Sequence, residues 1–534
     1  MEKRAFLAVL LSLVILVAYQ AWLAYQYGST PPSETKQESA KNSEPAKSKT
    51  LSELKPAVPA TPSVAGESKE IRIETDQYVA ILSNRGARLK SFALKHYRAT
   101  IDKNSPPVDV ISHEPGVPSP LGLRLNAPAA YDDDNLMYAV TGDDLRLAGS
   151  EKGKLIFEAQ TPTGVSVKKE FTFTGSTYTI DMDMAVGGGD GNLSPSLVLT
   201  SPLRGPTPEA HFEGFVGLVG SKLIHGPVEL PKKEQEYNGV ISWAGFGYTY
   251  FLLAVLPDTT NEQRVTLRET NSFISLDLAS SSNNQGVSNS HYTLFIGPKD
   301  LDVLKSLGRG LERSINFGYF SFISLPLLYV LRFLNRFTGS YGLDIILLTV
   351  LMKLITAPLT HKSYTSMKQM QKLQPQMERL KEKFKDDKEK LNKEIMELYR
   401  RNKVNPLGGC LPMVIQIPIF IGLYNALQTP IELRHAPFMW IKDLSRPDWE
   451  SLPFHFYGMS LGWPILTILM GASMFVQQWM TPSAGDPNQR RMMMLMPIMF
   501  TAMFINFPSG LTIYWLVNNV LSIAQQYLVN RMHR

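Results

Sequence analysis

Long apolar runs occur at the start of the chain and throughout its last third. The first run lies within residues 1–27 and holds about twenty mostly apolar residues, enough to cross a hydrocarbon core of about 30 Å. The later runs are residues 342–361, 411–429, 462–480, 493–507 and 509–529. This pattern predicts a polytopic α-helical membrane protein with six transmembrane helices, of which the last five form one core.

The first apolar run follows Lys3 and Arg4, an arrangement shared by cleaved signal peptides and uncleaved anchors. Its length favours an anchor. So do Trp22, Tyr25 and Tyr27 at its end, because Trp and Tyr concentrate at membrane interfaces. We therefore expect an N-terminal transmembrane anchor that begins in the cytoplasm.

The region after the anchor divides into a linker and a β-rich domain. Residues 28–69 are rich in Pro, Ser, Lys, Glu and Ala and contain no aromatic residue, which predicts a disordered linker. Residues 70–314 then carry short runs of β-forming residues between Gly, Pro, Asn and Asp, and such runs predict a large all-β sandwich outside the cytoplasm. The clearest strand candidates are residues 165–174, 178–184, 264–268 and 273–278. Leucines at helical spacing predict a short amphipathic helix over residues 299–314, at the end of this domain.

Residues 315–340 are also apolar, so hydropathy alone leaves the number of spans open. If this segment crossed the bilayer, the Lys-rich stretch that follows residue 361 would lie outside, against the positive-inside rule. We therefore predict an amphipathic helix in the outer interface, with Pro326 interrupting it and Arg332 and Arg336 reaching the polar boundary. Both termini are then cytoplasmic.

The charge distribution agrees with this topology. Basic residues gather at 362–403, at 490–491 and at the C-terminus, which the topology places in the cytoplasm. It also predicts transmembrane helix 2 at 341–361, and helices 3–6 within 406–534. The connections are a periplasmic loop at 430–461 and a cytoplasmic loop at 481–492.

The cytoplasmic segment 362–405 is expected to fold as a helical hairpin. Apolar residues recur there in steps of three and four, in two runs that indicate a coiled-coil seam. Those residues are Met367, Met370, Leu373, Met377, Leu380 and Phe384, then Leu391, Ile395 and Leu398. Asp386 and Asp387 stand between the two runs and mark the turn.

Net charge and cysteine content exclude several classes of function. The net charge of +6 and pI of about 9.0 would suit a protein that binds nucleic acid or an anionic membrane. In a chain with apolar spans, the excess of Lys and Arg is better explained by basic residues in the cytoplasmic loops. No direct nucleic-acid binding is expected. The single cysteine, Cys410, excludes an intramolecular disulfide and a Cys-rich metal site, and the nine histidines form no ligand-spaced cluster.

Lys353 is the most informative single residue, because it lies about 15 Å into the second predicted span when counted from Leu343. A cation at that depth costs about 2.5 to 3.5 kcal/mol on insertion scales and should face water or a partner. Thr349, Thr356 and Thr360 share its helical face. Asp344 lies nine residues back on the opposite face. The pattern predicts a polar cavity.

Other spans offer polar groups that would line a wet groove with Lys353. The alternative is that they make ordinary hydrogen bonds between helices, and for a single Asn or Gln the two interpretations are equally supported. These residues are Gln416, Tyr424, Asn425, Gln477, Gln478, Asn506, Tyr514, Asn518, Asn519, Ser522, Gln525 and Gln526.

Motifs for common enzymes are missing from the sequence. It contains no G-x-x-x-x-G-K-S/T phosphate loop, no H-E-x-x-H and no G-x-S-x-G, so no catalytic residue, metal or cofactor is expected. Two rivals stay open. The cavity would also suit a channel or small-solute carrier, and a large β-sandwich also suits a carbohydrate-binding or envelope-enzyme role.

The last third of the chain resembles the YidC/Oxa/Alb family of membrane protein insertases, in its Gram-negative form with a large periplasmic domain. Eight stretches in one order carry the resemblance. They are Thr349-Val-Leu-Met-Lys353, Ala357-Pro-Leu-Thr360, Tyr364-Thr-Ser-Met367, Leu373-Gln-Pro-Gln376, Lys403-Val-Asn-Pro-Leu-Gly-Gly-Cys410, Gln416-Ile-Pro-Ile-Phe420, Glu432-Leu-Arg-His-Ala-Pro-Phe438 and Phe507-Pro-Ser-Gly510. The β-rich region matches mainly in position and size.

The resemblance implies an inner-membrane insertase and chaperone, whose hydrophilic groove opens to the cytoplasm and to lipid. The family usually has Arg where this chain has Lys353. Lysine keeps the positive charge but lacks the guanidinium that can bind a carboxylate through two hydrogen bonds. Tyr514 and Trp515 match aromatic residues that contact substrate, although plain packing explains them equally well. The implied partners are nascent membrane proteins, the lipid bilayer, the Sec translocon, the signal-recognition pathway and ribosomes.

Overall fold

The computed structural model describes residues 68–111, 114–125, 131–188, 194–207, 210–226, 234–258, 262–279, 287–385, 387–402, 404, 411–456, 459–481 and 487–532. The chain divides into two compact units. The described part of the first unit comprises residues 68–298 and 307–314, and that of the second comprises 299–306 and 315–532. The predicted anchor, and all of the predicted linker except its last two residues, lie outside the described residues.

The first unit is built from strands. They are β1 (Glu70–Glu74), β2 (Tyr78–Ser83), β3 (Arg88–Arg98), β4 (Pro107–Asp109), β5 (Gly122–Leu125), β6 (Tyr131–Asp132), β7 (Ala139–Thr141), β8 (Leu145–Arg146), β9 (Lys152–Gln160), β10 (Ser166–Thr174), β11 (Thr179–Gly187), β12 (Pro195–Pro202), β13 (Phe212–Val219), β14 (Lys222–His225), β15 (Glu234–Tyr248), β16 (Phe251–Pro257), β17 (Glu262–Glu269), β18 (Phe273–Ala279) and β19 (Val287–Pro298). One 3-10 turn, Asp133–Asn135, follows β6.

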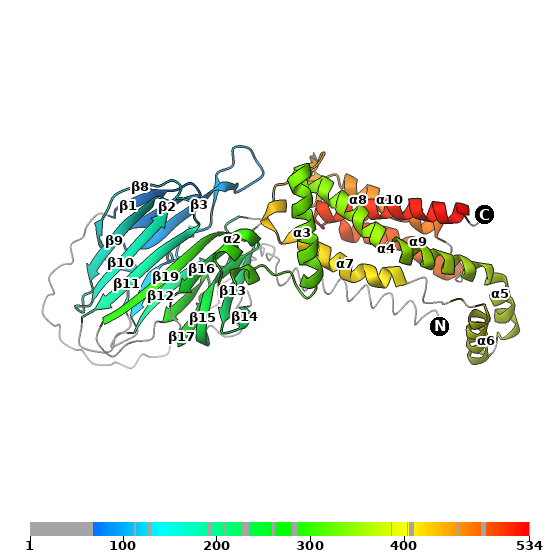
Figure 1. Ribbon diagram of the computed structural model, residues 1–534, viewed down its shortest axis with the longest axis horizontal. Coiled ribbons are helices and arrows are strands. Elements are labelled where there is room, and N and C mark those ends of the chain that lie inside the picture. The colour runs from blue at the N-terminus through cyan, green and yellow to red at the C-terminus, as the bar shows by residue number, and fades with distance from the viewer. Residues whose placement is uncertain are drawn as a thin grey trace, which may run out of the picture. The chain divides into compact units, whose positions relative to one another are not determined.

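These strands form a β-sandwich (Figure 1). A large sheet has the order β6-β5-β12-β18-β17-β15-β16-β19-β11-β10-β9-β7, and a smaller sheet has the order β4-β3-β2-β1-β8. Strand β15 joins the two parts of the large sheet, because its first half pairs with β17 and its second half pairs with β13 and β16. The predicted all-β sandwich is confirmed.

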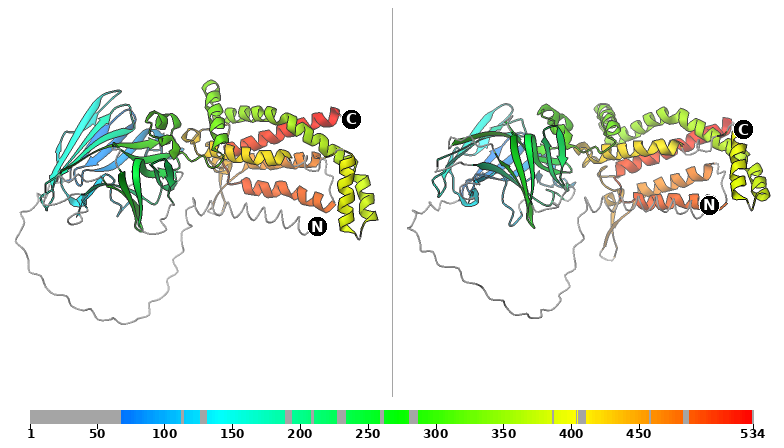
Figure 2. Two further views of the ribbon diagram at one scale, coloured as in Figure 1. Left: turned by 60° about the horizontal axis from the view of Figure 1, so that its bottom comes forward. Right: turned by 90° about the horizontal axis from the view of Figure 1, so that it is seen from below.

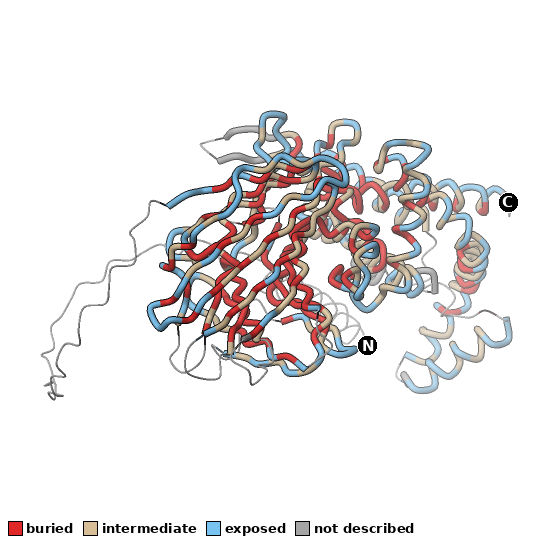
Figure 3. The backbone as a smooth tube through the Cα atoms, turned by 60° about the vertical axis from the view of Figure 1, so that its left-hand side comes forward, coloured by how far each residue is buried: buried red, intermediate tan, exposed pale blue. Residues whose placement is uncertain are grey.

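Alternating burial explains why the sequence revealed these strands. In β10 every second side chain is buried, and β11 repeats the pattern, as expected for strands with one face on a core. Figure 3 shows the same alternation of buried and partly exposed positions along the strands. The strands predicted at 165–174, 178–184, 264–268 and 273–278 correspond to β10, β11, β17 and β18.

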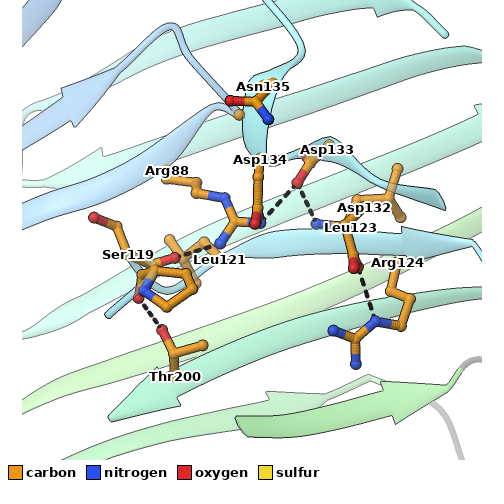
Figure 4. A network of polar contacts seen from close by, with 12 residues as sticks. Arg88, Ser119, Leu121, Leu123, Arg124, Asp132, Asp133, Asp134, Asn135 and Thr200 are labelled. Carbon is orange, nitrogen blue, oxygen red and sulfur yellow. Dashed lines mark hydrogen bonds and ion pairs between the residues drawn. The ribbon is translucent and has the colours of Figure 1, made fainter. Parts of the chain in front are cut away.

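A buried network of charges lies inside the sandwich. The Lys169 ammonium on β10 is fully buried and donates to Asp133 at 2.6 Å and to the carbonyls of Gly86 and Leu121 at 2.8 and 2.9 Å. Arg88 on β3 donates to the other oxygen of Asp133 at 3.0 Å and to Asp134 (Figure 4). The network therefore ties the smaller sheet to the larger one.

The pKa values of this network reflect burial and pairing together. Burial lowers the pKa of Lys169, since a dry environment disfavours the ammonium. Burial alone would raise the pKa of Asp133, but the cations of Lys169 and Arg88 outweigh it and hold that pKa below its ordinary value. The carboxylate also accepts from the Leu123 amide at 2.9 Å and the Tyr138 hydroxyl at 2.9 Å, so its oxygens are well satisfied.

The second unit is helical. Its helices are α2 (Leu301–Ser306), α3 (Ser321–Thr338), α4 (Tyr341–Lys372), α5 (Gln374–Lys383), α6 (Lys388–Arg401), α7 (Leu411–Gln428), α8 (Ile465–Met480), α9 (Pro487–Phe504) and α10 (Ser509–Met532). Two 3-10 turns, Ile431–Leu433 and Asp448–Ser451, and a hairpin of β20 (Pro453–Phe456) and β21 (Met459–Gly462) fill the predicted loop between α7 and α8. Within this unit, α3 lies across one end of the bundle, and α5 and α6 lie at the other end (Figure 2).

The single helix predicted over 299–314 is wrong. The structure has α2 at Leu301–Ser306 and a separate 3-10 turn at Leu311–Ser314. Gly308, Arg309 and Gly310 between them all have positive φ, which ends the helix. By its contacts α2 belongs to the helical unit, whereas the prediction assigned it to the sandwich domain.

Two boundaries in the last third also differ from the prediction. The helix predicted at 341–361 continues as α4 to Lys372, because no residue after Pro358 interrupts it before Pro375. The predicted loop at 481–492 is shortened by α9, which begins at Pro487, and proline is favoured at the first position of a helix. Arg490 and Arg491 therefore belong to a helix.

Among the described residues, one helix is both long and apolar enough to cross a membrane, and it is α4. Three further apolar helical stretches are shorter. They are Val414–Gln428, Ile465–Met480 and Met493–Phe504. The number of six transmembrane helices therefore stays a prediction.

Candidate functional site

Lys353 lies near the middle of the apolar part of α4, about 18 Å along the helix from Tyr341. Its side chain is half-buried, and its ammonium donates a hydrogen bond of 2.6 Å to the hydroxyl of Ser522 on α10. Within the part of the chain that the structure describes, no acidic side chain contributes an electrostatic interaction to Lys353. Asp344 instead accepts from Asn335 and Thr338 at the other end of α4.

One side of α10 presents polar groups to α4. Ser522 accepts from Lys353 and donates to the Asn518 carbonyl at 2.7 Å. Gln525, three residues after Ser522 on α10, donates to the Ala357 carbonyl on α4 at 3.0 Å. Lys353 therefore belongs to a continuous polar track between α4 and α10.

A second polar stripe on α10 faces α8. Asn519 donates to the Ser473 hydroxyl at 3.0 Å, and Gln526 donates to the Met480 carbonyl at 2.7 Å. Asn519 and Gln526 are buried, so these bonds are of the ordinary interhelical kind. For these two residues the packing interpretation holds.

The threonines predicted to share the face of Lys353 are bound within their own helix. Thr349 is buried and donates to the Ile345 carbonyl at 2.6 Å, and Thr356 donates to the Met352 carbonyl at 2.9 Å. A hydroxyl bonded to the preceding turn keeps lone pairs free to accept from a further partner. Thr356 also donates to the Lys353 backbone carbonyl at 3.3 Å, but the structure shows neither threonine bonded to the Lys353 ammonium.

The remaining predicted groove residues meet nearer the start of α10. Gln416 on α7 donates to the hydroxyl of Tyr514, which is buried. Trp515 packs edge-on against Phe420 at 5.1 Å between ring centroids and also contacts Phe504. Trp515 is therefore part of an aromatic cluster of α7, α9 and α10. Asn518 lies about one turn further along α10, four residues before Ser522, and is half-buried.

The loop between α7 and α8 packs against the starts of α4 and α8. Asp448 in this loop is buried and accepts from the Leu466 amide and the Thr467 hydroxyl at 2.8 Å each, which caps α8. Phe438 packs so closely on α4 that a Cβ at Gly342 would lie 2.1 Å from its ring. A side chain at position 342 would therefore displace Phe438 and this loop.

Arg332 ties α3 to the same loop. Its guanidinium donates to Glu432 at 2.8 Å and lies 3.4 and 3.1 Å from Asp300 and Asp302. Burial raises the pKa of Glu432, although Arg332 opposes that shift. Arg332 was predicted at the polar boundary, but its partner Glu432 could not be predicted because it is 100 positions away in the sequence.

The hairpin residues form a small core of their own. Met370, Leu373 and Val404 are buried together, and Met367 packs against them. Tyr399 on α6 donates to the sulfur of Met377 on α5 at 3.2 Å. Asp387 caps α6 by accepting from the Lys390 amide at 3.0 Å. Asp386 lies outside the described residues. The first arm of the hairpin consists of two helices that meet near Leu373, because Pro375 lies in the first turn of α5.

Fold and site together define a class of protein: a β-sandwich followed along the chain by a helical unit, which holds a polar track and a helix long and apolar enough to cross a membrane. Two family models match, the 60Kd inner membrane protein at residues 333–534 and the YidC periplasmic domain at residues 70–330. The membrane protein insertase YidC of Geobacter sulfurreducens is 42% identical, over 99% of this chain and 98% of its own length. That of Pelobacter propionicus is 39% identical, over 100% of this chain and 99% of its own length.

The chain belongs to the YidC family of membrane protein insertases, which is not a family of enzymes. A crystal structure of an active YidC insertase with its first transmembrane domain resolved is 19% identical, with a TM-score of 0.39, and covers 87% of this chain and 93% of that one.

Proposed function

We propose that this chain inserts membrane proteins through a groove centred on Lys353, and that the lysine attracts polar and acidic parts of an incoming segment. The observation that carries the proposal is the environment of the ammonium. It lies deep along an apolar helix and has a neutral hydroxyl as its partner. A buried cation is expensive, and one without a nearby carboxylate is available to a substrate's carboxylate.

Exposed apolar side chains support the second half of the proposal, the release of a hydrophobic segment into lipid. Leu354 and Ile355 directly follow Lys353 and are 67% and 64% exposed. A hydrated groove shortens the low-dielectric path for polar groups, while burial of apolar surface in lipid contributes about 25 cal/mol per Å². Insertion then needs no nucleotide.

The proposed topology has six spans with both termini in the cytoplasm, and α7, α8, α9 and α10 supply the last four. Helix α3 lies in the outer interface, since Phe322, Phe333 and Phe337 are exposed beside the Arg332 cluster. The loop that carries Asp448 then faces the periplasm and closes the groove there. The hairpin of α5 and α6 faces the cytoplasm.

Within this arrangement Thr349, Thr356, Gln416, Tyr514, Trp515 and Asn518 line the groove around Lys353. The hairpin, with its core at Met370 and Met377, receives substrate from the cytoplasm. The proposed partners are nascent membrane proteins in the bilayer, the Sec translocon, and ribosomes with the signal-recognition pathway. The relatives' name, membrane protein insertase, supports the substrate class.

Photo-crosslinking tests the proposed groove. A crosslinker placed at Gln416, which faces Tyr514, is expected to capture a stalled nascent membrane protein. The same crosslinker at Val476, exposed on α8 and outside the polar track, serves as the control and should capture mainly lipid. Capture of the nascent chain at Val476 but not at Gln416 would mean that substrate takes a different route.

A further inference from the structure

We propose that Ser522 is a positioning residue for Lys353: its hydroxyl fixes the ammonium in the groove without neutralising the charge. This inference rests on the proposed function of Lys353 and deepens it. It names the group that holds the lysine ammonium in place.

The hydrogen-bond pattern around Ser522 has a defined direction. The Ser522 hydroxyl donates its one hydrogen to the Asn518 carbonyl at 2.7 Å, so only lone pairs remain for other groups. The Lys353 ammonium, which has donors only, lies 2.6 Å from that oxygen. The contact is therefore a charge-assisted hydrogen bond from lysine to serine.

Ser522 is itself held in place from several sides. It is buried, and the Tyr364 side chain of α4 lies close to both Ser522 and Gln477 of α8. Ser522 thus lies where α4, α8 and α10 meet. A lysine side chain has a flexible four-carbon stem, and a fixed acceptor at its tip removes much of that freedom.

A neutral acceptor is the right kind of partner for a cation that must bind substrate. A carboxylate at this distance would pair with the ammonium and offset most of its field. A hydroxyl satisfies one of its three donors and leaves two donors and the full charge for an incoming carboxylate. Ser522 thereby favours substrates with acidic segments.

The test compares Ser522→Ala with Ser522→Thr, which keeps the hydroxyl, at equal protein level in the full chain. We expect Ser522→Ala to slow insertion of substrates with acidic translocated segments by about three- to tenfold, the range of one ordinary hydrogen bond, because the cation itself remains. Ser522→Thr should restore the rate, and substrates without acidic residues should be unaffected. The matched control is Ser473→Ala, which removes a hydroxyl between α8 and α10 that does not contact Lys353, and it should insert normally.

A double variant separates positioning from packing. If Ser522 acts through Lys353, Lys353→Ala and Lys353→Ala with Ser522→Ala should insert equally well, because the group being positioned is already gone. A further loss in the double variant, or equal loss for substrates with and without acidic residues, would overturn the positioning role. If Lys353→Ala alone inserts normally, the proposed function itself fails. If Lys353→Ala impairs insertion and Ser522→Ala does not, only this inference fails.

Discussion

Replacing Lys353 by alanine is expected to lower insertion of substrates with acidic translocated segments by about tenfold or more, the equivalent of one charge-assisted hydrogen bond. Lys353→Arg should keep most of the activity. The reason is that the cation is the only charge identified in the polar track among the described residues, and arginine supplies the same charge with more donors. Insertion is measured by protease protection of the translocated segment.

The control for this prediction is a set of substrates that differ only in the charge of the translocated segment. Lys353→Ala should affect the acidic version most and the neutral version least, since the lost interaction is electrostatic. Equal insertion of all versions by Lys353→Ala, at equal protein level, would remove Lys353 from the mechanism.

Lys169→Met is expected to destabilise the β-sandwich by about 3 to 5 kcal/mol, because it leaves the buried Asp133 carboxylate without its closest cation. It also removes a donor from the carbonyls of Gly86 and Leu121, which both have positive φ and lie in the turns that the network joins. The effect is measured by limited proteolysis of the full chain over a denaturant series.

Lys154→Ala provides the matched control. Lys154 lies on the neighbouring strand β9 and pairs with Glu170 at 2.7 Å, but its side chain is 62% exposed. Solvent screens exposed ion pairs strongly, so this change should move the transition little. Equal transitions for both variants would show that the buried network does not hold the sheets together.

The sequence predicted those features that depend on local pattern. Alternation of apolar residues located β10 and β11, because each strand has one face on the core. The depth of Lys353 in an apolar run predicted a cation that needs water or a polar partner, and its ammonium donates to Ser522. Helical spacing also identified the apolar positions Met370 and Met377 of the hairpin.

Features that depend on pairing between distant segments could not be predicted. Ser522 is among the polar residues predicted to line a groove with Lys353, but the two are 169 positions apart, and no local pattern shows which of those residues contacts the ammonium. The same applies to Lys169, which is fully buried and pairs with Asp133, 36 positions away. At 299–314 the leucine spacing was correct for a helix, but the Gly308 and Gly310 backbone ended it.

Cysteine labelling at position 353 tests the central claim most directly, that this position lies in a water-filled recess open to the cytoplasm. The chain has one cysteine, Cys410, which is first changed to serine, and Lys353→Cys is then exposed to a membrane-impermeant maleimide. Leu354→Cys is the control, because its side chain is 67% exposed in the protein and would face lipid. The account predicts labelling at 353 from the cytoplasmic side alone and none at 354. Labelling at 353 only from the periplasmic side, or from neither side, would contradict it.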